Sequence, residues 1–201
     1  MRIITSFSFL IAAILAGPTF SAAQPGPPAA SAKINSSGGN SPHETTSGVI
    51  GGRNGNRVTV TYGRPFSKGR KIWGTLVPWN DPYRLGSDEA TTLITQQPIQ
   101  IGDTAIPAGV YTLYMIPSEK EASKLAFSTA LGKWGIPVDT THDFARVDLK
   151  KDAVAQTVDQ LTLAVVPNSG PDANPAGGTL KITWENTQYS VAFIVPSLVK
   201  K

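Results

Sequence analysis

Residues that could do chemistry are concentrated between Arg57 and Thr92, a stretch that begins and ends with strand-like sequence. It holds three carboxylates, Asp81, Asp88 and Glu89. Between its strand-like ends lie five cations: Arg64, Lys68, Arg70, Lys71 and Arg84. Gly and Pro residues break the stretch into turns. This mixture suggests either a binding site or a loop that is held in place by salt bridges.

Arg64, Arg70 and Arg84 could converge on an anion, because a guanidinium group offers a planar pair of donors to carboxylate, phosphate or sulfate. The alternative is that these arginines pair with Asp81, Asp88 and Glu89 and pin a long loop to the rest of the fold. The spacing in the sequence is compatible with both alternatives.

A catalytic alternative would use Asp88 or Glu89 with His142 as an acid or base. Asp88 and Glu89 are adjacent, and adjacent side chains on a strand point to opposite faces. A hydrolase with a facing carboxylate pair would therefore need another acid, such as Asp81 or Asp143. His43 and His142 are the only histidines and have no H-x-H, H-E-x-x-H or cysteine partner, so we expect no metal site.

Aromatic rings in the same stretch could form the apolar wall of a binding site. Tyr62, Trp73 and Tyr83 are assigned this role, with Glu89 orienting the arginines. Rings in loops can stack on ligands such as sugars, or they can plug the ends of the fold. The candidate ligand-binding residues are Tyr62, Arg64, Arg70, Trp73, Tyr83, Arg84, Asp88 and Glu89.

Strand patterns position these residues. Val58, Val60 and Tyr62 alternate with polar residues, and similar patterns recur as far as Val195. Further strands are expected within 90–95, 99–101, 110–116, 125–127, 145–149, 161–165, 179–185 and 189–195. The last two are expected to form a hairpin that turns at 185–187. Short helices are compatible only with 118–123 and 152–156. The prediction is an all-β fold, an antiparallel β-sandwich of immunoglobulin-like or jelly-roll kind with eight or nine strands and few short helices.

Composition limits the classes of function. The 201 residues suit one ordinary domain, and the absence of Cys excludes disulfides, thiolate metal sites and cysteine nucleophiles. The formal net charge is +4, but part of the excess lies in Arg2 and in Lys200 and Lys201. We therefore expect no nucleic-acid partner.

The N-terminus has the layout of a secretory signal. Arg2 precedes an apolar run from Ile3 to Gly17, and the small residues Ser21 to Ala23 follow. The apolar run is shorter than the roughly 20 residues that a spanning helix needs. The predicted organisation is a signal peptide over 1–23 cleaved near Ala23, a disordered tether over 24–40, one domain over 41–197 and a basic tail over 198–201. The mature protein would be periplasmic or extracellular, with no membrane span.

Several blocks resemble a known family. They are Ser41-Pro42, VTVTYGRP (58–65), KGRKIWG (68–74), LVP (76–78), an Arg84-x-Gly86 pair, EAT (89–91), PAGVYTL (107–113), IP (116–117) and TLKITWE (179–185). From about Ser41 to Val195 the chain resembles the bacterial domain-of-unknown-function family DUF2911. The resemblance implies an exported β-rich protein and brings no established activity, cofactor or catalytic residue. Tyr83 and Asp88 stand where the family usually has Trp and Asn.

The functional interpretation is a non-catalytic protein that binds a small-molecule, anionic or glycan ligand at the 64–89 region and uses no cofactor. A periplasmic hydrolase with a carboxylate and His142, and a purely structural envelope protein, are the alternatives. Arginines that face a void would favour binding, and arginines that close on carboxylates would favour a structural role.

Overall fold

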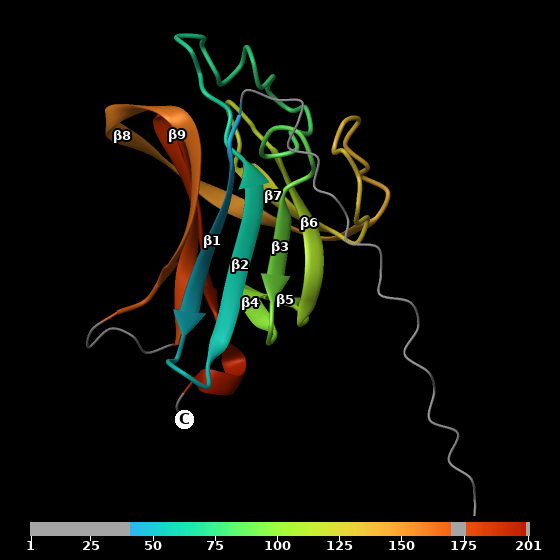
Figure 1. Ribbon diagram of the computed structural model, residues 1–201, viewed down its shortest axis with the longest axis vertical. Helices are drawn as coiled ribbons and strands as arrows, with labels where there is room; N and C mark the ends of the chain where they lie inside the picture. Colours follow the sequence, from blue (N-terminus) through green and yellow to red (C-terminus); the bar gives the residue numbers. More distant parts are fainter. Residues whose placement is uncertain (1–40, 170–175, 200–201) are drawn as a thin grey trace, which may run out of the picture. The chain divides into compact units, whose positions relative to one another are not determined.

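The computed structural model describes residues 41–169 and 176–199 (Figure 1). The predicted signal peptide and tether lie outside these residues, as do Lys200 and Lys201 of the basic tail, so export and its cleavage site stay predictions. Within the described ranges, no helix is long and apolar enough to cross a membrane.

Nine antiparallel strands make up the fold, which confirms the predicted all-β class. One 3₁₀ turn, Pro196–Leu198, follows the last strand. The strands are β1 His43–Ile50, β2 Asn56–Gly63, β3 Thr92–Thr95, β4 Ile99–Ile101, β5 Thr104–Ile106, β6 Gly109–Ile116, β7 Ser123–Ser128, β8 Asp143–Pro167 and β9 Gly177–Ile194. They form one hydrogen-bonded sheet in the order β1-β2-β3-β6-β7-β8-β9-β4-β5. The division into two separate sheets that a sandwich requires is not confirmed.

The length of β8 explains why the sheet is continuous. Residues 143–149 of β8 pair with β7, and residues from Lys150 onward pair with β9. Figure 1 shows both long strands curving sharply. The far part of β8 reaches β1 and β2, where the Tyr62 hydroxyl accepts a 2.9 Å hydrogen bond from the Leu163 amide. One strand thus contributes to both sides of the core.

The expected C-terminal hairpin at 185–187 is wrong, because these residues lie inside β9. Glu185 has a positive φ of 56°, and the pairing register shifts near Val158 on the opposite strand. The polar residues therefore mark a bulge that bends a long strand, not a turn that ends it. The separate strands expected at 145–149 and 161–165 are likewise both part of β8.

The two expected short helices do not form either. Residues 152–156 continue β8, where Asp152 pairs with Gln188 across the ladder. Residues 118–122 make an irregular turn in which the Ser118 amide donates to the Ser123 hydroxyl at 2.9 Å. β9 pairs with the backbone at 152 and 153, and serine hydroxyls accept hydrogen bonds from the Ser118 and Glu121 amides, so a helix is not needed in either place.

The core consists of the inward side chains of the alternating strands. Val58, Val60 and Tyr62 are at most 1% exposed, and they belong to the same apolar cluster as Leu163 and Ile182. A second part of the cluster is aromatic. The Trp73 ring meets Trp184 edge-on at 6.5 Å and Tyr189 at 4.9 Å. Trp73 belongs to the loop that carries the candidate site, and it packs that loop onto Trp184 and Tyr189 of β9.

All five tyrosines should make the protein sensitive to alkali. Burial raises the pKa of Tyr62, Tyr83, Tyr111 and Tyr189, and burial followed by the hydrogen bond to Asp143 raises the pKa of Tyr114 to about 12. The unfolded chain releases these protons near the ordinary tyrosine pKa of about 10, and the folded chain retains them. Stability should therefore be intact below about pH 10 and fall as the pH rises further.

Thermal unfolding midpoints measured from neutral pH to about pH 11 test this prediction. The Tyr114→Phe variant is the control, because its midpoint should fall less steeply with pH than that of the unchanged chain. A midpoint that stays constant through this range in both proteins would contradict the assignment.

Candidate functional site

The candidate site lies in the loop between β2 and β3, residues 64–91, at one end of the sheet. The strands hold this loop through backbone hydrogen bonds. Tyr83 exchanges two with Met115 of β6, at 2.8 and 2.9 Å, and the Asn80 amide donates to the Pro117 carbonyl at 2.7 Å. The Ser67 amide donates to the Asp159 carbonyl at 2.6 Å. The loop is therefore docked at several points along its length.

Arg64 acts as a clamp between the loop and two strands. Its Nη1 lies 2.5 Å from Glu44 Oε2 on β1. Its Nε donates to the Leu161 carbonyl at 3.1 Å, and its Nη2 donates to the Thr162 hydroxyl at 3.0 Å on β8. The guanidinium is thus fully engaged by the protein itself, with a partner, Glu44, that lies outside the predicted set.

Arg70 is exposed and closes on its own turn. Its Nε and Nη2 donate to the carbonyls of Ser67 and Phe66, each at 2.8 Å. This short-range pattern stiffens residues 66–70. The structure therefore does not bring Arg70 together with Arg64 or Arg84 around one ligand.

Tyr62 and Trp73, two of the rings assigned to an apolar wall, are core residues. They are 1% and 4% exposed. The Trp73 indole donates to the Trp184 carbonyl at 3.2 Å, so its polar edge is satisfied inside the protein. Tyr83 differs, since it is half-buried, stacks on Trp184 at 6.3 Å and also reaches the surface.

Arg84 is held by neutral partners. Its Nη1 donates to the carbonyls of Asp88 and Trp134 at 2.5 and 3.3 Å, and its Nε donates to the Gly86 carbonyl at 3.2 Å. Burial lowers the pKa of Arg84, an effect that Tyr83, Asp88 and Glu89 oppose. Among the described residues, no carboxylate lies within ion-pair distance of Arg84, so its charge is not cancelled by a direct partner.

Asp88 and Glu89 face a histidine instead of the arginines. His43 Nε2 lies 2.9 Å from Glu89 Oε2 and 3.9 Å from Asp88 Oδ2. This cluster ties the start of β1 to the loop. Neither predicted alternative describes the site fully, because the three arginines close mainly on backbone carbonyls and the carboxylates close on His43.

The groups of the hydrolase alternative lie in separate clusters. The His142 Nδ1 lies 3.1 Å from Asp139 Oδ2, whereas Glu89 is bonded to His43. Hydrogen bonds from Thr141, and then from His142, lower the pKa of Asp139 to about 2. His142 thus has a different acidic partner from the one that the sequence suggested. In the part of the chain that is described, no three His, Asp or Glu residues form a group that could hold a metal ion.

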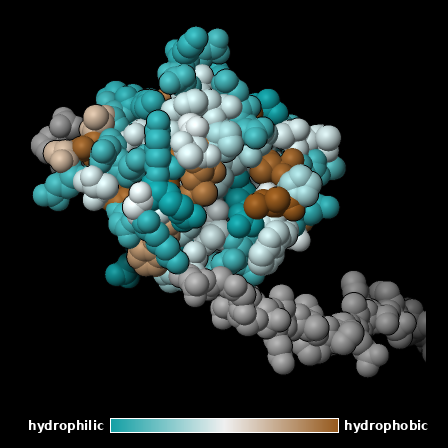
Figure 2. All heavy atoms as spheres, turned by 90° about the horizontal axis from the view of Figure 1, so that it is seen from above, coloured by the Kyte–Doolittle hydropathy of each residue, from teal (hydrophilic) through white to brown (hydrophobic). Residues whose placement is uncertain are grey.

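An open groove of about 390 Å³ lies between the 76–84 segment and residues 136–138. Arg84 and Asp81 supply its charges. Its apolar lining consists of Leu76, Pro78, Pro82, Tyr83, Ile136, Pro137 and Val138. Figure 2, which looks onto the upper end of the view in Figure 1, shows apolar patches within a mostly hydrophilic surface. Leu76 and Ile136, with exposed fractions of 40% and 63%, are the features that the sequence analysis missed.

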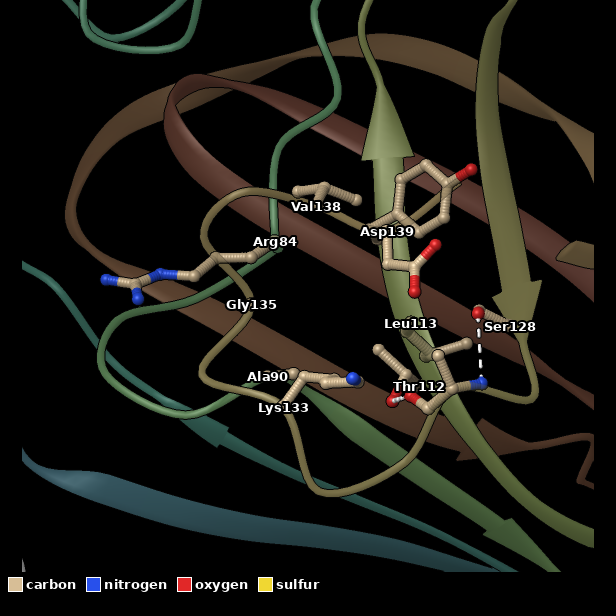
Figure 3. Close-up of a pocket in the computed structure, with 11 residues that line it drawn as sticks. Arg84, Ala90, Thr112, Leu113, Ser128, Lys133, Gly135, Val138 and Asp139 are labelled. Atoms are coloured by element: carbon tan, nitrogen blue, oxygen red, sulfur yellow. Dashed lines mark hydrogen bonds between the residues drawn. The ribbon is translucent and has the colours of Figure 1, made fainter. Parts of the chain in front are cut away.

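A small cavity shares Arg84 and Val138 with the groove (Figure 3). Its volume is about 20 Å³, which is room for little more than one water molecule. Figure 3 shows the Arg84 guanidinium pointing away from Asp139 and from the other side chains of this cavity. Gly135 lies on the Arg84 stem so closely that a Cβ there would be 3.1 Å from the Arg84 Cβ and Cδ atoms. Arg84 therefore lines both hollows, with its guanidinium directed away from the small cavity.

Comparison with known proteins gives one match. No curated protein and no solved structure matches the chain. The model of a family described as "Protein of unknown function (DUF2911)" matches residues 41–193. This range confirms the resemblance seen in the sequence motifs, and because it covers most of the chain, the chain belongs to the DUF2911 family.

Proposed function

We propose that this protein binds a small amphipathic anion, without converting it, in the groove between residues 76–84 and 136–138. The observation that carries this proposal is the position of Arg84, a guanidinium held by carbonyls alone, beside exposed apolar side chains. An anion would supply the negative partner that the Arg84 guanidinium lacks, and an apolar body would cover Leu76 and Ile136. Binding of this kind needs neither a cofactor nor a proton-transferring pair.

The remaining predicted residues support this proposal indirectly. Tyr83 lines the groove itself, and the Asp88 carbonyl fixes Arg84. Arg64 and Arg70 hold the loop in place, which favours a structural role for these two arginines. Glu89 pairs with His43, and His142 pairs with Asp139. These contacts speak against the hydrolase alternative, which requires the carboxylate and His142 to act together.

Binding of 8-anilinonaphthalene-1-sulfonate, a fluorescent amphipathic anion, tests the proposal. The folded chain should bind it saturably, and Arg84→Gln should weaken binding about tenfold, because a charge-assisted contact is worth about 1.5–3 kcal/mol. The neutral probe N-phenyl-1-naphthylamine should bind both proteins alike, since it lacks the sulfonate.

A second pair of variants distinguishes loss of a groove contact from a general disturbance of the loop by the Arg84 substitution. Leu76→Ser should weaken binding of both probes several-fold, because it removes apolar surface from the groove. Ile94→Ser is the matched control, with a 43% exposed side chain on β3 outside the groove. Equal binding by Leu76→Ser and Ile94→Ser, or a signal that never saturates, would refute the proposal.

A further inference from the structure

Exposed apolar side chains cluster on one short loop that follows β7. Nine large apolar residues are exposed among the described residues, and Leu131, Trp134 and Ile136 fall within six positions. Their exposed fractions are 48%, 54% and 63%, the last two being the highest of the nine. A soluble surface normally scatters such residues singly, so a concentration of this kind calls for a covering surface.

Positive charge accompanies this apolar loop, residues 131–136. Lys133 lies between Leu131 and Trp134 and is exposed, and the Arg84 guanidinium lies 5.8 Å from the centre of the Trp134 ring. No carboxylate occurs in the sequence between Glu121 and Asp139. Asp139 itself is bonded to Thr141 and His142. Asp88 and Glu89, the acids that act on Arg84, face His43. The loop therefore presents cations next to apolar tips, and the neighbouring acids have partners elsewhere.

The tip of the loop is free of packing contacts. Gly132 has a φ of 70°, and a Cβ placed there would meet no atom within 4 Å. The base is anchored, since the Lys133 carbonyl accepts a hydrogen bond from the Ala90 amide at 3.3 Å and the Trp134 carbonyl accepts one from Arg84. A fixed base with an unpacked tip is suited to inserting side chains into a soft surface.

We propose that residues 131–136 attach the protein reversibly to an anionic lipid surface. Tryptophan favours the interface between headgroups and acyl chains, and Leu131 and Ile136 would enter the apolar layer. Lys133 and Arg84 would lie at the level of the lipid phosphates, where the negative surface potential attracts cations. The charge pattern favours anionic lipid over an apolar protein partner, which would require no cations at the centre of the patch.

This attachment shares Arg84 and Ile136 with the proposed ligand groove, but other residues distinguish the two proposals. Leu131 and Trp134 do not line the groove, whereas Leu76 lines the groove and lies outside the loop. Variants at Leu131 and Trp134 therefore test the membrane contact, and Leu76→Ser tests the ligand site. Failure of one proposal leaves the other measurable.

A fluorescent label on the loop tests whether these residues themselves contact lipid. Because the chain has no cysteine, Leu131→Cys provides a unique site for an environment-sensitive nitrobenzoxadiazole label. The full chain carrying this label should show brighter emission at shorter wavelength with vesicles of phosphatidylglycerol and phosphatidylcholine in equal parts. Nitroxide-bearing lipids should quench it. Ile94→Cys, at an exposed position of β3, carries the control label and should show neither change.

The label must report on the loop alone, because the apolar N-terminal run is present in every variant and would contribute to any measurement of total lipid binding. Within the labelled Leu131→Cys chain, Trp134→Ser should reduce the emission shift, and Lys133→Gln should reduce it at low salt more than at high salt. Equal signals from the labels at 131 and 94, or an equal response to vesicles of phosphatidylcholine alone, would overturn the proposal.

Discussion

Replacing Trp184 with alanine should lower the free energy of unfolding by about 3–5 kcal/mol, the range observed when a fully buried large aromatic side chain is truncated. Trp184 is 1% exposed. Its ring contacts Trp73 edge-on and stacks with Tyr83 at an angle of 24°. Its indole also donates to the Asp159 carbonyl at 3.1 Å, so the substitution would remove a polar contact together with the apolar packing.

Urea-induced unfolding measures this change, and Trp134→Ala provides the control. Trp134 is 54% exposed, so its loss should alter stability by no more than about 0.5 kcal/mol. The Trp184 variant should also bind the anionic probe more weakly, because Tyr83, which lines the groove next to Arg84, would lose the ring on which it stacks. A loss of stability below that of an ordinary surface substitution would show that the aromatic cluster does not support the loop.

Arg64→Met should destabilise the fold by about 2–3 kcal/mol, because the guanidinium satisfies groups on two strands at once. The Leu161 carbonyl would lose its side-chain donor, and Leu161 is fully buried. The ion pair contributes little of this, since the Glu44 side chain is 37% exposed and is screened by water. The clamp is therefore mainly a set of hydrogen bonds to β8.

Double-mutant analysis in urea separates the two contributions. Combining Arg64→Met with Glu44→Gln should reveal a coupling of about 0.5–1 kcal/mol, far less than the whole effect. Arg70→Met is the matched control and should cost under about 1 kcal/mol, because water can reach the carbonyls of its exposed turn. Equal losses for Arg64→Met and Arg70→Met would mean that Arg64 is not a clamp.

Strand positions could be predicted where one face is buried. Val58, Val60 and Tyr62 alternate with polar residues, and β2 follows that pattern. β1 escaped prediction because its first half carries no large apolar residue. The side chains of this half remain at least partly exposed while its backbone pairs with β2. The sequence also did not reveal that β9 is one continuous strand, since the polar residues at its bulge resemble those of a turn.

The sequence indicated which loop to consider as a candidate site, but not which groups the charged side chains of that loop would contact. The 64–91 loop does carry the groove-lining Tyr83 and Arg84. Arginine partners were beyond prediction because most of them are backbone carbonyls, which every residue has. The groove itself also needs residues 136–138, which lie more than fifty positions away in the sequence and reach Arg84 only through the fold.

The position of β9 in the sheet determines when folding can finish. Gln100 of β4 pairs with Ile194 of β9, and β9 also supplies the partner of most of β8. A nascent chain that lacks its last strand therefore leaves β4 and β5 detached from the other strands and the inner edge of β8 without its ladder. Contacts between residues so distant in sequence form slowly. The sheet is thus completed only after almost the whole chain has been synthesised.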